Sequence, residues 1–280
     1  MFDKPMRYLL LACLLFCTSP VRADLPPLSF GVFPNLSARQ VVEIYRPLAQ
    51  ALEKHLKREV VIYSARDFRT FAQRTAKGEY DILLTAPHLA WLARQDAGYR
   101  PLLKYATPTH GLLVVRKDSD LHDPEALRGK TLARADALAV TVLATQTELA
   151  ARGLRAGVDY QLRDAGTHNN AVMQVINKKA EAAALGLHPY LLLAPDLRAQ
   201  LRVLIESPPV SSLMYLTHPR LRDSEAQAIR KAMLAFAASS EGQAFMERGG
   251  YGGYASVDGQ ELRAFRPYAL EVQSLLREAP

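Results

Sequence analysis

Residues 79–88 read EYDILLTAPH, and residues 179–188 read KAEAAALGLH. In both segments an acidic residue precedes a short run of apolar or small residues, then a turn and a histidine. Such an uncharged run is typical of a strand buried on both faces, as in a parallel α/β sheet. Ligands of these sheets bind beyond the carboxyl ends of the strands, where His88 and His188 would stand. The repeat predicts two similar halves facing one cleft, and chance similarity is the alternative.

The flanking sequence extends this pattern into two α/β alternations. In the first, strands are expected at 28–33, 60–63 and 80–84, and Ser37 can cap a helix whose apolar positions follow the 3.6-residue period. In the second, strands are expected at 112–116, 131–133 and 181–185, with helices at 139–152 and 167–177. The chain then returns through strands and closes with helices. We expect mainly parallel sheets flanked by helices in each of two lobes.

The division of the chain follows from this order of elements. Residues 24–108 form the first part of lobe 1, residues 109–208 an inserted lobe 2, and residues 209–280 the return to lobe 1. Two crossing strands, near 105–114 and 205–215, would form the hinge.

Residues 1–23 have the features of a signal peptide. Lys4 and Arg7 precede a short apolar run, and a small-x-small site ends at Ala23. The run is about half of the ~20 residues needed to span a bilayer. We therefore expect a periplasmic protein. Anchoring as a lipoprotein through Cys13, in the sequence LLAC, is the less favoured alternative.

Composition excludes several classes of function. Both cysteines, Cys13 and Cys17, lie in the leader, so the mature chain has no disulfide or thiolate site. The net charge is +7, but no basic block is interleaved with aromatic residues, so nucleic acid is not an expected partner. A modest positive field favours small anions.

Histidines supply the main candidates for a binding site. Each of four ends an element that faces the predicted cleft: His88, His110, His168 and His188. His168 stands at a helix start, where free amides and the helix dipole favour an anion. The cluster predicts either donors for an oxyanion or imidazole ligands for a metal or its chelate.

An anion is favoured over a metal because metal-ligand spacings such as HExxH are missing. We expect no cofactor and no resident metal. No Gly-x-Ser-x-Gly elbow is present, so we do not expect an enzyme, and a secreted metal-dependent hydrolase remains the competing class. Asp81 and Glu181 precede their strands at the end away from the cleft, where we expect surface or capping roles.

Several short motifs resemble one family across nearly the whole mature chain. They are Gly31–Pro34, Tyr45–Ala49, Gly78–Ile82, Val115–Ser119, Leu127–Lys130, Gly166–Asn170 and Ser207-Pro208. In these motifs the chain resembles the phosphate/phosphite/phosphonate-type (PhnD-like) periplasmic substrate-binding proteins of ABC transporters. The resemblance implies a two-lobed type II periplasmic-binding-protein fold and delivery of a solute to an inner-membrane permease.

Departures from the family pattern concern the solute. The family's Ser-Thr-Ser-Gly run corresponds here to Ala139–Val142, which keeps one hydroxyl, on Thr141. Family tyrosines correspond to Phe68 and Thr85, and an acidic residue that meets an ammonium group corresponds to His188. An aminoalkylphosphonate is therefore not favoured. Phosphate, phosphite, another small oxyanion and a metal-linked species remain open.

The expected function is that of a monomeric solute carrier which binds a small anion between its lobes. A periplasmic sensor module would bind the same ligand and differ only in its partner. Phe68 would wall the site. The contacts would come from Asn35, Thr85, His88 and His110 in the first lobe and hinge, and from Thr141, His168 and His188 in the second lobe.

Overall fold

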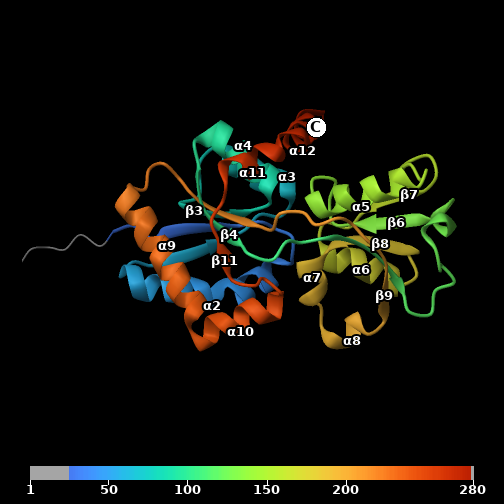
Figure 1. Cartoon of the computed structure of the whole chain (residues 1–280), viewed down its shortest axis with the longest axis horizontal. Coiled ribbons are helices and arrows are strands. Elements are labelled where there is room, and N and C mark those ends of the chain that lie inside the picture. Colours follow the sequence, from blue (N-terminus) through green and yellow to red (C-terminus); the bar gives the residue numbers. More distant parts are fainter. Residues whose placement is uncertain (1–24, 279–280) are drawn as a thin grey trace, which may run out of the picture.

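The structure is a computed structural model that describes residues 25–278. The expected signal peptide, residues 1–23, lies outside the described residues, together with Cys13 and Cys17. Within 25–278, no helix is both long and apolar enough to cross a membrane. The chain forms two lobes side by side, each a sheet flanked by helices (Figure 1).

The first lobe is built on a sheet with the strand order β11-β4-β10-β3-β1-β2. Its strands β1, β2 and β3 run parallel, whereas β10, β4 and β11 pair antiparallel because the chain leaves and re-enters the lobe there. The strands are β1 (Leu28–Val32), β2 (Val60–Tyr63), β3 (Ile82–Thr85), β4 (Arg100–Tyr105), β10 (Met214–Thr217) and β11 (Tyr254–Ala255). The helices are α2 (Ala38–Leu56), α3 (Phe68–Ala76), α4 (Pro87–Ala97), α9 (Asp223–Ala238), α10 (Ser240–Gly249), α11 (Gly259–Ala264) and α12 (Arg266–Glu278).

The second lobe repeats this plan with the strand order β7-β6-β8-β5-β9. Strands β6, β7 and β8 are parallel, and β5 pairs antiparallel with β8 and β9. The strands are β5 (Gly111–Arg116), β6 (Thr131–Arg134), β7 (Gln161–Asp164), β8 (Ala182–Gly186) and β9 (Leu201–Glu206). The helices are η1 (Pro124–Leu127), α5 (Val140–Ala151), α6 (His168–Ile176), α7 (Leu187–Leu191) and α8 (Pro195–Arg198).

Two segments cross between the lobes, residues 106–110 from β4 to β5 and residues 207–213 from β9 to β10. They are joined by two backbone hydrogen bonds, from Thr109 N to Val210 O (2.8 Å) and from Val210 N to Thr109 O (2.7 Å). This pairing holds the two crossings side by side between the sheets.

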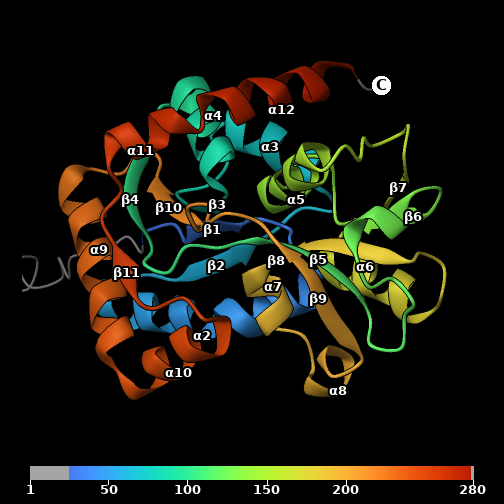
Figure 2. The same cartoon turned by 45° about the vertical axis from the view of Figure 1, so that its right-hand side comes forward.

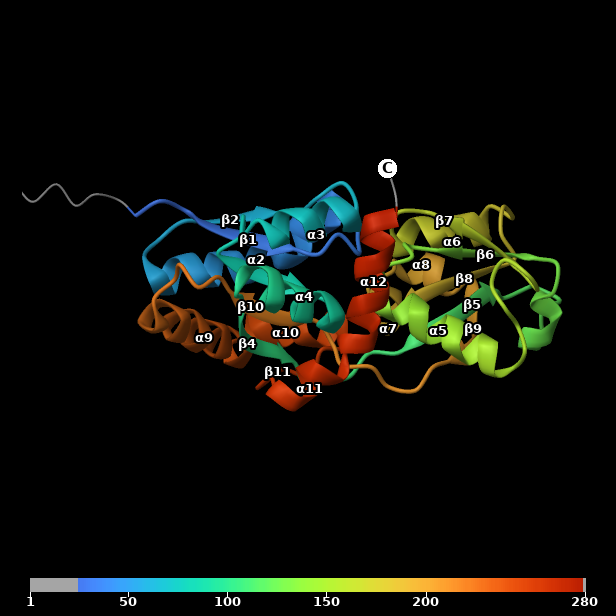
Figure 3. The same cartoon turned by 90° about the horizontal axis from the view of Figure 1, so that it is seen from above.

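Helix α12 lies at the border of the lobes (Figures 2 and 3). Its C-terminal carbonyls, those of Leu275 and Leu276, accept hydrogen bonds from the Arg69 guanidinium of α3 at 2.9 and 2.7 Å. Its buried side chains Ala269 and Val272 belong to an apolar cluster that includes residues of both sheets. The apolar core is therefore continuous across the border between the lobes.

The repeated segments of the sequence occupy matching places in the two sheets. Asp81, just before β3, accepts the amide of Ser29 in β1 at 2.8 Å, and Glu181, just before β8, accepts the amide of Thr131 in β6 at 2.9 Å. Each acidic residue thus ties its own strand to the parallel neighbour. The echo in the sequence reflects a real structural repeat.

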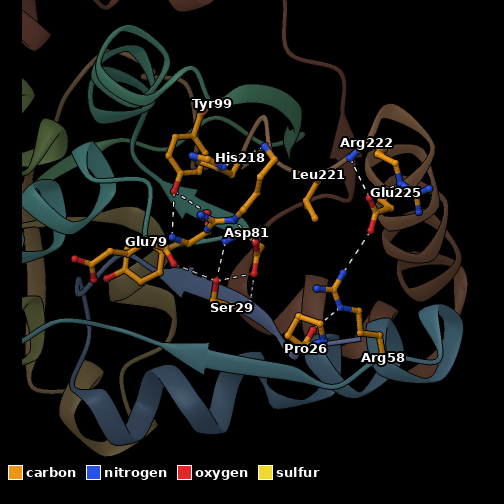
Figure 4. Close-up of polar contacts among 12 residues, drawn as sticks. Pro26, Ser29, Arg58, Glu79, Asp81, Tyr99, His218, Leu221, Arg222 and Glu225 are labelled. Carbon is orange, nitrogen blue, oxygen red and sulfur yellow. Dashed lines mark hydrogen bonds and ion pairs between the residues drawn. The ribbon is translucent and has the colours of Figure 1, made fainter. Parts of the chain in front are cut away.

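The expected surface role of Asp81 is corrected by its environment (Figure 4). Its carboxylate is buried and also accepts the Ser29 hydroxyl at 2.8 Å and Arg220 Nε at 2.5 Å. Burial raises the pKa of Asp81, but these hydrogen bonds and the Arg220 charge outweigh it and lower the pKa overall. The carboxylate therefore stabilises the fold in its charged form.

We expect Asp81→Asn to lower the free energy of unfolding by about 1–3 kcal/mol at pH 7, because buried hydrogen bonds to a charged acceptor are lost. The folded-state pKa is lowered, so this contribution is present above the unfolded pKa of about 4 and fades as the pH falls. Urea unfolding at pH 7 and pH 3 measures both effects. Asp223→Asn is the control. Asp223 also forms an ion pair with an arginine, Arg100, but its side chain is 88% exposed, so the loss of this pair should cost little stability. Equal losses in the two variants would contradict this role.

Candidate binding site between the lobes

A cavity of about 40 Å³ lies between the lobes where the chain crosses. One buried water needs 10–15 Å³ of such space, so the cavity has room for roughly three water-sized groups. This size suits a small ion rather than a sugar or peptide. The lining side chains are Phe33, Asn35, Ala86, Pro87, Thr109, Ala139, Val140, Thr141, His168, Gly186, His188, Pro189, Ser211 and Leu213.

Two helices from opposite lobes begin at this cavity. Helix α4 starts after Ala86 and helix α5 after Ala139, and neither N-cap residue makes a side-chain cap hydrogen bond. In contrast, Asp67 caps α3 and Thr167 caps α6. Helix α5 offers first-turn amides at the cavity, whereas α4 begins with Pro87, which has no N–H, and contributes its helix dipole. Neither helix start has an acidic cap. This arrangement favours negative charge between them.

Two glycines allow Thr141 to reach the cavity from the first turn of α5. A Cβ on Gly111 of β5 would lie 2.2 Å from the Thr141 carbonyl oxygen, and a Cβ on Gly186 would lie 3.2 Å from its hydroxyl. Only a residue without a side chain permits the approach at Gly111. The close packing of α5 on β5 and β8 therefore sets the position of the Thr141 hydroxyl.

Charged side chains are missing from the cavity wall, among the residues that the structure describes. A carboxylate behind the wall, Glu261 of α11, accepts the Ser211 hydroxyl at 2.5 Å and forms an ion pair with Lys104. That pair is neutral as a whole. The polar side-chain groups that a solute in the cavity would meet are hydroxyl, amide and imidazole groups.

Several polar atoms around the cavity are buried without a hydrogen-bond partner. They are Asn35 Oδ1, Thr109 Oγ1 and His168 Nδ1, within the described chain. Buried polar groups are normally paired, and each unpaired one costs free energy. A polar solute would supply the missing partners.

His168 faces the cavity in its neutral form. Burial lowers its pKa to about 4, and its side chain is almost fully enclosed. Its backbone amide donates to the Asn35 carbonyl across the border of the lobes at 3.4 Å. A neutral imidazole offers one donor and one acceptor, so His168 can bind an anion without a charge of its own.

His188 lines the cavity but uses both ring nitrogens elsewhere. Nδ1 lies 2.9 Å from the Gly249 carbonyl, so Nδ1 carries the proton and Nε2 accepts the Ser212 hydroxyl at 2.9 Å. Burial lowers the pKa of this histidine also to about 4. His188 thereby ties α7 to the second crossing and to the end of α10, and it contributes the surface of its ring to the wall.

The expected convergence of four histidines needs correction, because two of them do not reach the cavity. His88 is fully buried, and its Nε2 donates to the Leu138 carbonyl of the second lobe at 2.8 Å. His110 turns away, with Nδ1 at 2.8 Å from Ser207 O and 3.2 Å from the Glu206 carboxylate. Both histidines stabilise the border or the crossing rather than the cavity wall.

Phe68 and Thr85 also lie away from the cavity. Phe68 is fully buried and packs edge-on against Phe33, a lining residue, with ring centroids 4.4 Å apart. Thr85 lines a different cavity of about 120 Å³ beneath α12. Of the eight expected contact residues, the structure places four at the cavity: Asn35, Thr141, His168 and His188.

Lining residues on the crossings were missed by the sequence analysis. Thr109 precedes His110, which we expected to face the site, and Ser211 and Leu213 lie on the second crossing. The sequence signal that could have identified these residues was their position in the two expected hinge segments. In an extended segment, successive side chains point to opposite faces, and the sequence alone does not say which of them faces the cavity.

A metal centre does not fit these positions. Among residues 25–278, no group of three or more His, Cys, Asp or Glu side chains is placed to hold an ion. The four histidines are separated because His88 and His110 are bound to backbone carbonyls. The alternative of a metal or metal chelate held by these imidazoles therefore loses its ligand set.

We expect the free energy of unfolding to fall as the pH is lowered from about 6.5 to 4. Burial lowers the pKa of His88, His168 and His188 to about 4, so the unfolded chain, with histidine pKa values near 6.5, takes up protons first. Each of these three histidines contributes roughly 1.4 kcal/mol per pH unit to the slope of the free energy of unfolding against pH in this window. His168→Gln should remove one such contribution in urea titrations across the window. An unchanged slope in that variant would contradict the neutral burial of His168.

His88→Leu should favour an open arrangement of the lobes, because the hydrogen bond to the Leu138 carbonyl joins them. A hydrogen bond contributes a net free energy of about 0.5–1.5 kcal/mol, so its loss should raise the ratio of open to closed molecules roughly two- to tenfold. Small-angle X-ray scattering would show a larger radius of gyration. His88→Gln retains a donor and should change the radius less. Identical scattering from wild type and His88→Leu would show that this hydrogen bond does not hold the lobes together.

Comparison with known proteins agrees with this architecture. The family model described as "ABC transporter, phosphonate, periplasmic substrate-binding protein" matches residues 30–262. A binding protein component of an ABC phosphonate transporter from Pseudomonas aeruginosa is 18% identical, with a TM-score of 0.78 over 89% of this chain and 87% of that chain.

Two further solved structures have similar folds. PhnD1 from Prochlorococcus marinus, in complex with methylphosphonate, is 11% identical, with a TM-score of 0.74 over 88% of this chain and 98% of that chain. XAC2383 from Xanthomonas citri, bound to chloride ion, is 20% identical, with a TM-score of 0.68 over 90% and 99%. At these identities the structures show a shared fold.

Proposed function

Because the chain belongs to the family of periplasmic substrate-binding proteins of phosphonate ABC transporters, we propose that it binds a small oxyanion between its lobes. The observation that carries this proposal is the uncharged cavity at which α4 and α5 begin from opposite lobes. Helix N-termini bind anions through free amides and the helix dipole. An ion held there would draw the two lobes together.

The wall of the cavity narrows the class of solute. Without a lining carboxylate, the cavity offers no charged partner for an ammonium group, so an aminoalkylphosphonate is disfavoured. Its volume of about 40 Å³ favours a small oxyanion over a larger solute, and phosphate, phosphite and methylphosphonate are the candidates. The methylphosphonate complex of PhnD1 and the chloride complex of XAC2383 support an anion in this fold.

We assign direct contacts to Asn35, Thr141 and His168, with Thr109 added from the first crossing. The remaining expected residues have supporting roles. Phe68 backs the wall at Phe33, and His88, His110 and His188 hold the border and the crossings. Thr85 packs beneath α12.

Affinity in this arrangement comes from hydrogen bonds made in a cavity that excludes water. A micromolar solute needs about 8 kcal/mol, and hydrogen bonds to a charged group contribute about 1.5–3 kcal/mol each. Four or five such bonds suffice after the cost of ordering is subtracted. The closed lobes would then be the form presented to the permease.

The proposal also includes the localisation, the division into lobes and the protein partner. Residues 1–23 would act as a signal peptide that directs a monomeric, non-enzymatic carrier to the periplasm. The lobes would divide at 24–108, 109–208 and 209–280. An inner-membrane permease would be the protein partner, and nucleic acid would not be one.

Isothermal titration with inorganic phosphate, phosphite and methylphosphonate tests the proposal. We expect at least one of them to bind, and Thr141→Val to weaken binding about 10- to 100-fold, because one hydrogen bond to a charged group is lost. Thr147→Val is the matched control on the same helix, since the Thr147 hydroxyl bonds to the Leu143 carbonyl and does not line the cavity.

The opposite results would each count against the proposal. Binding of none of these anions would remove the assignment as an oxyanion carrier. Equal weakening by Thr141→Val and Thr147→Val would show that α5 acts through stability and not through contact with the solute.

A further inference from the structure

Beyond the proposed function, we propose that the cavity beneath α12 is a second binding site, which takes a small neutral alcohol or phenol. This cavity measures about 120 Å³ and lies among α3, α4 and the end of β3, with Leu276 of α12 in its wall (Figure 2). It shares no lining residue with the cavity between the lobes. The two sites are therefore separate.

The size and the lining of this cavity favour an organic occupant over water. One buried water needs 10–15 Å³, so about eight waters would be required to fill the space. Buried waters need polar partners, whereas most of the wall consists of apolar side chains such as Phe71, Leu89, Leu92 and Ala93. A dry apolar cavity of about 150 Å³ is large enough for benzene. A ring of similar size is thus a suitable occupant here.

Two buried hydroxyl groups of the wall have no hydrogen-bond partner within residues 25–278. They are those of Thr75, which is 5% exposed, and Thr85, which is 1% exposed. Buried polar groups are normally paired. A hydroxyl group can both donate and accept, so one hydroxyl on a ligand can donate to one threonine and accept from the other.

The secondary structure directs both threonines to the cavity. Side chains alternate along β3, so Thr85 lies on the same face of the sheet as Leu83, whose apolar cluster includes Phe71 and Leu276. On α3, Thr75 follows Phe71 by about one turn and lies on the same buried face of the helix. A strand and a helix therefore bring unpaired hydroxyl groups to one enclosed space.

The charges around the cavity indicate a neutral occupant. Asp96, in the last turn of α4, is the charged side chain of the described wall, and it is exposed to solvent. It interacts electrostatically with Arg277 of α12. Near the two buried threonines, a charged group on a ligand would lose its water without gaining an opposite charge.

Titration of the mature chain with phenol and toluene tests the proposal, because the two differ by a hydroxyl group in place of a methyl group. We expect both to bind, since both bury an apolar ring. Thr75→Val and Thr85→Val should each lower the affinity for phenol relative to toluene about two- to tenfold, because one hydrogen bond is lost.

Thr70→Val is the matched control on α3. The Thr70 hydroxyl accepts a hydrogen bond from Arg66 Nε at 3.2 Å and does not line the cavity. Its replacement should leave the ratio of the two affinities unchanged.

The variant Ala93→Leu tests the location of the site. Ala93 is buried in α4 and lines the cavity, so a leucine there should fill part of the space and weaken both compounds more than tenfold, with no loss of thermal stability. Ala90→Leu is the contrast on the same helix. Ala90 is fully buried outside the cavity wall, so a leucine there should overpack the core and lower the melting temperature.

Binding of neither compound by the wild type would overturn the second site, as would full binding by Ala93→Leu. If Ala93→Leu does not fold, the threonine variants decide: a phenol-to-toluene ratio equal to that of the wild type in both would overturn the proposal. None of these results affects the oxyanion proposal, which is tested with phosphate, phosphite and methylphosphonate at other residues.

Discussion

The two backbone hydrogen bonds between Thr109 and Val210 are the constraint on which the site depends. They fasten the two crossings to each other midway between the sheets. Each crossing then has a lobe at either end. Hydrogen bonds from Tyr105 N to Leu213 O and from Ser207 N to Gly111 O continue the pairing toward the two sheets. The cavity forms where the crossings, the start of α4 and the start of α5 meet, so its wall combines residues far apart in the chain.

The electrostatics of the site follow from how it is enclosed. A buried ion is costly unless it is paired, and the wall supplies helix ends, hydroxyls and amide groups in place of a cationic side chain. Burial keeps His168 and His188 neutral near pH 7. Some hydrogen bonds between the lobes involve no solute, such as those of His88 with Leu138 and of Asn169 with Gln40. They stabilise this arrangement of the lobes independently of a bound ion.

Much of the fold could be predicted from the sequence because its signals are local. The buried strands at 82–85 and 182–186 followed from uncharged runs, and the start of α2 followed from its capping residue, Ser37. The expectation of two lobes joined by two crossings is confirmed. Strand β11 carries no local signal in the sequence, because its two residues follow a glycine-rich stretch and pair only through tertiary contact with β4.

The site could be predicted only in part. His168 and Thr141 reach the cavity because each begins or nearly begins a helix that points at the cleft, a position visible in the sequence. Thr85 and His88 also stand at element ends, but their side chains turn beneath α12 and into the border of the lobes. Side-chain direction at those ends is decided by packing partners from distant segments, such as Leu276 and Leu138, and single-chain periodicity carries no information about them.

Diffraction from crystals of the mature chain grown with methylphosphonate would test the central claim most directly. The account predicts electron density for one tetrahedral anion enclosed between Asn35 of the first lobe and Thr141 of the second, with the crossings still paired at Thr109 and Val210. An anion bound only on the outer surface, with the cavity empty and the lobes closed, would contradict it.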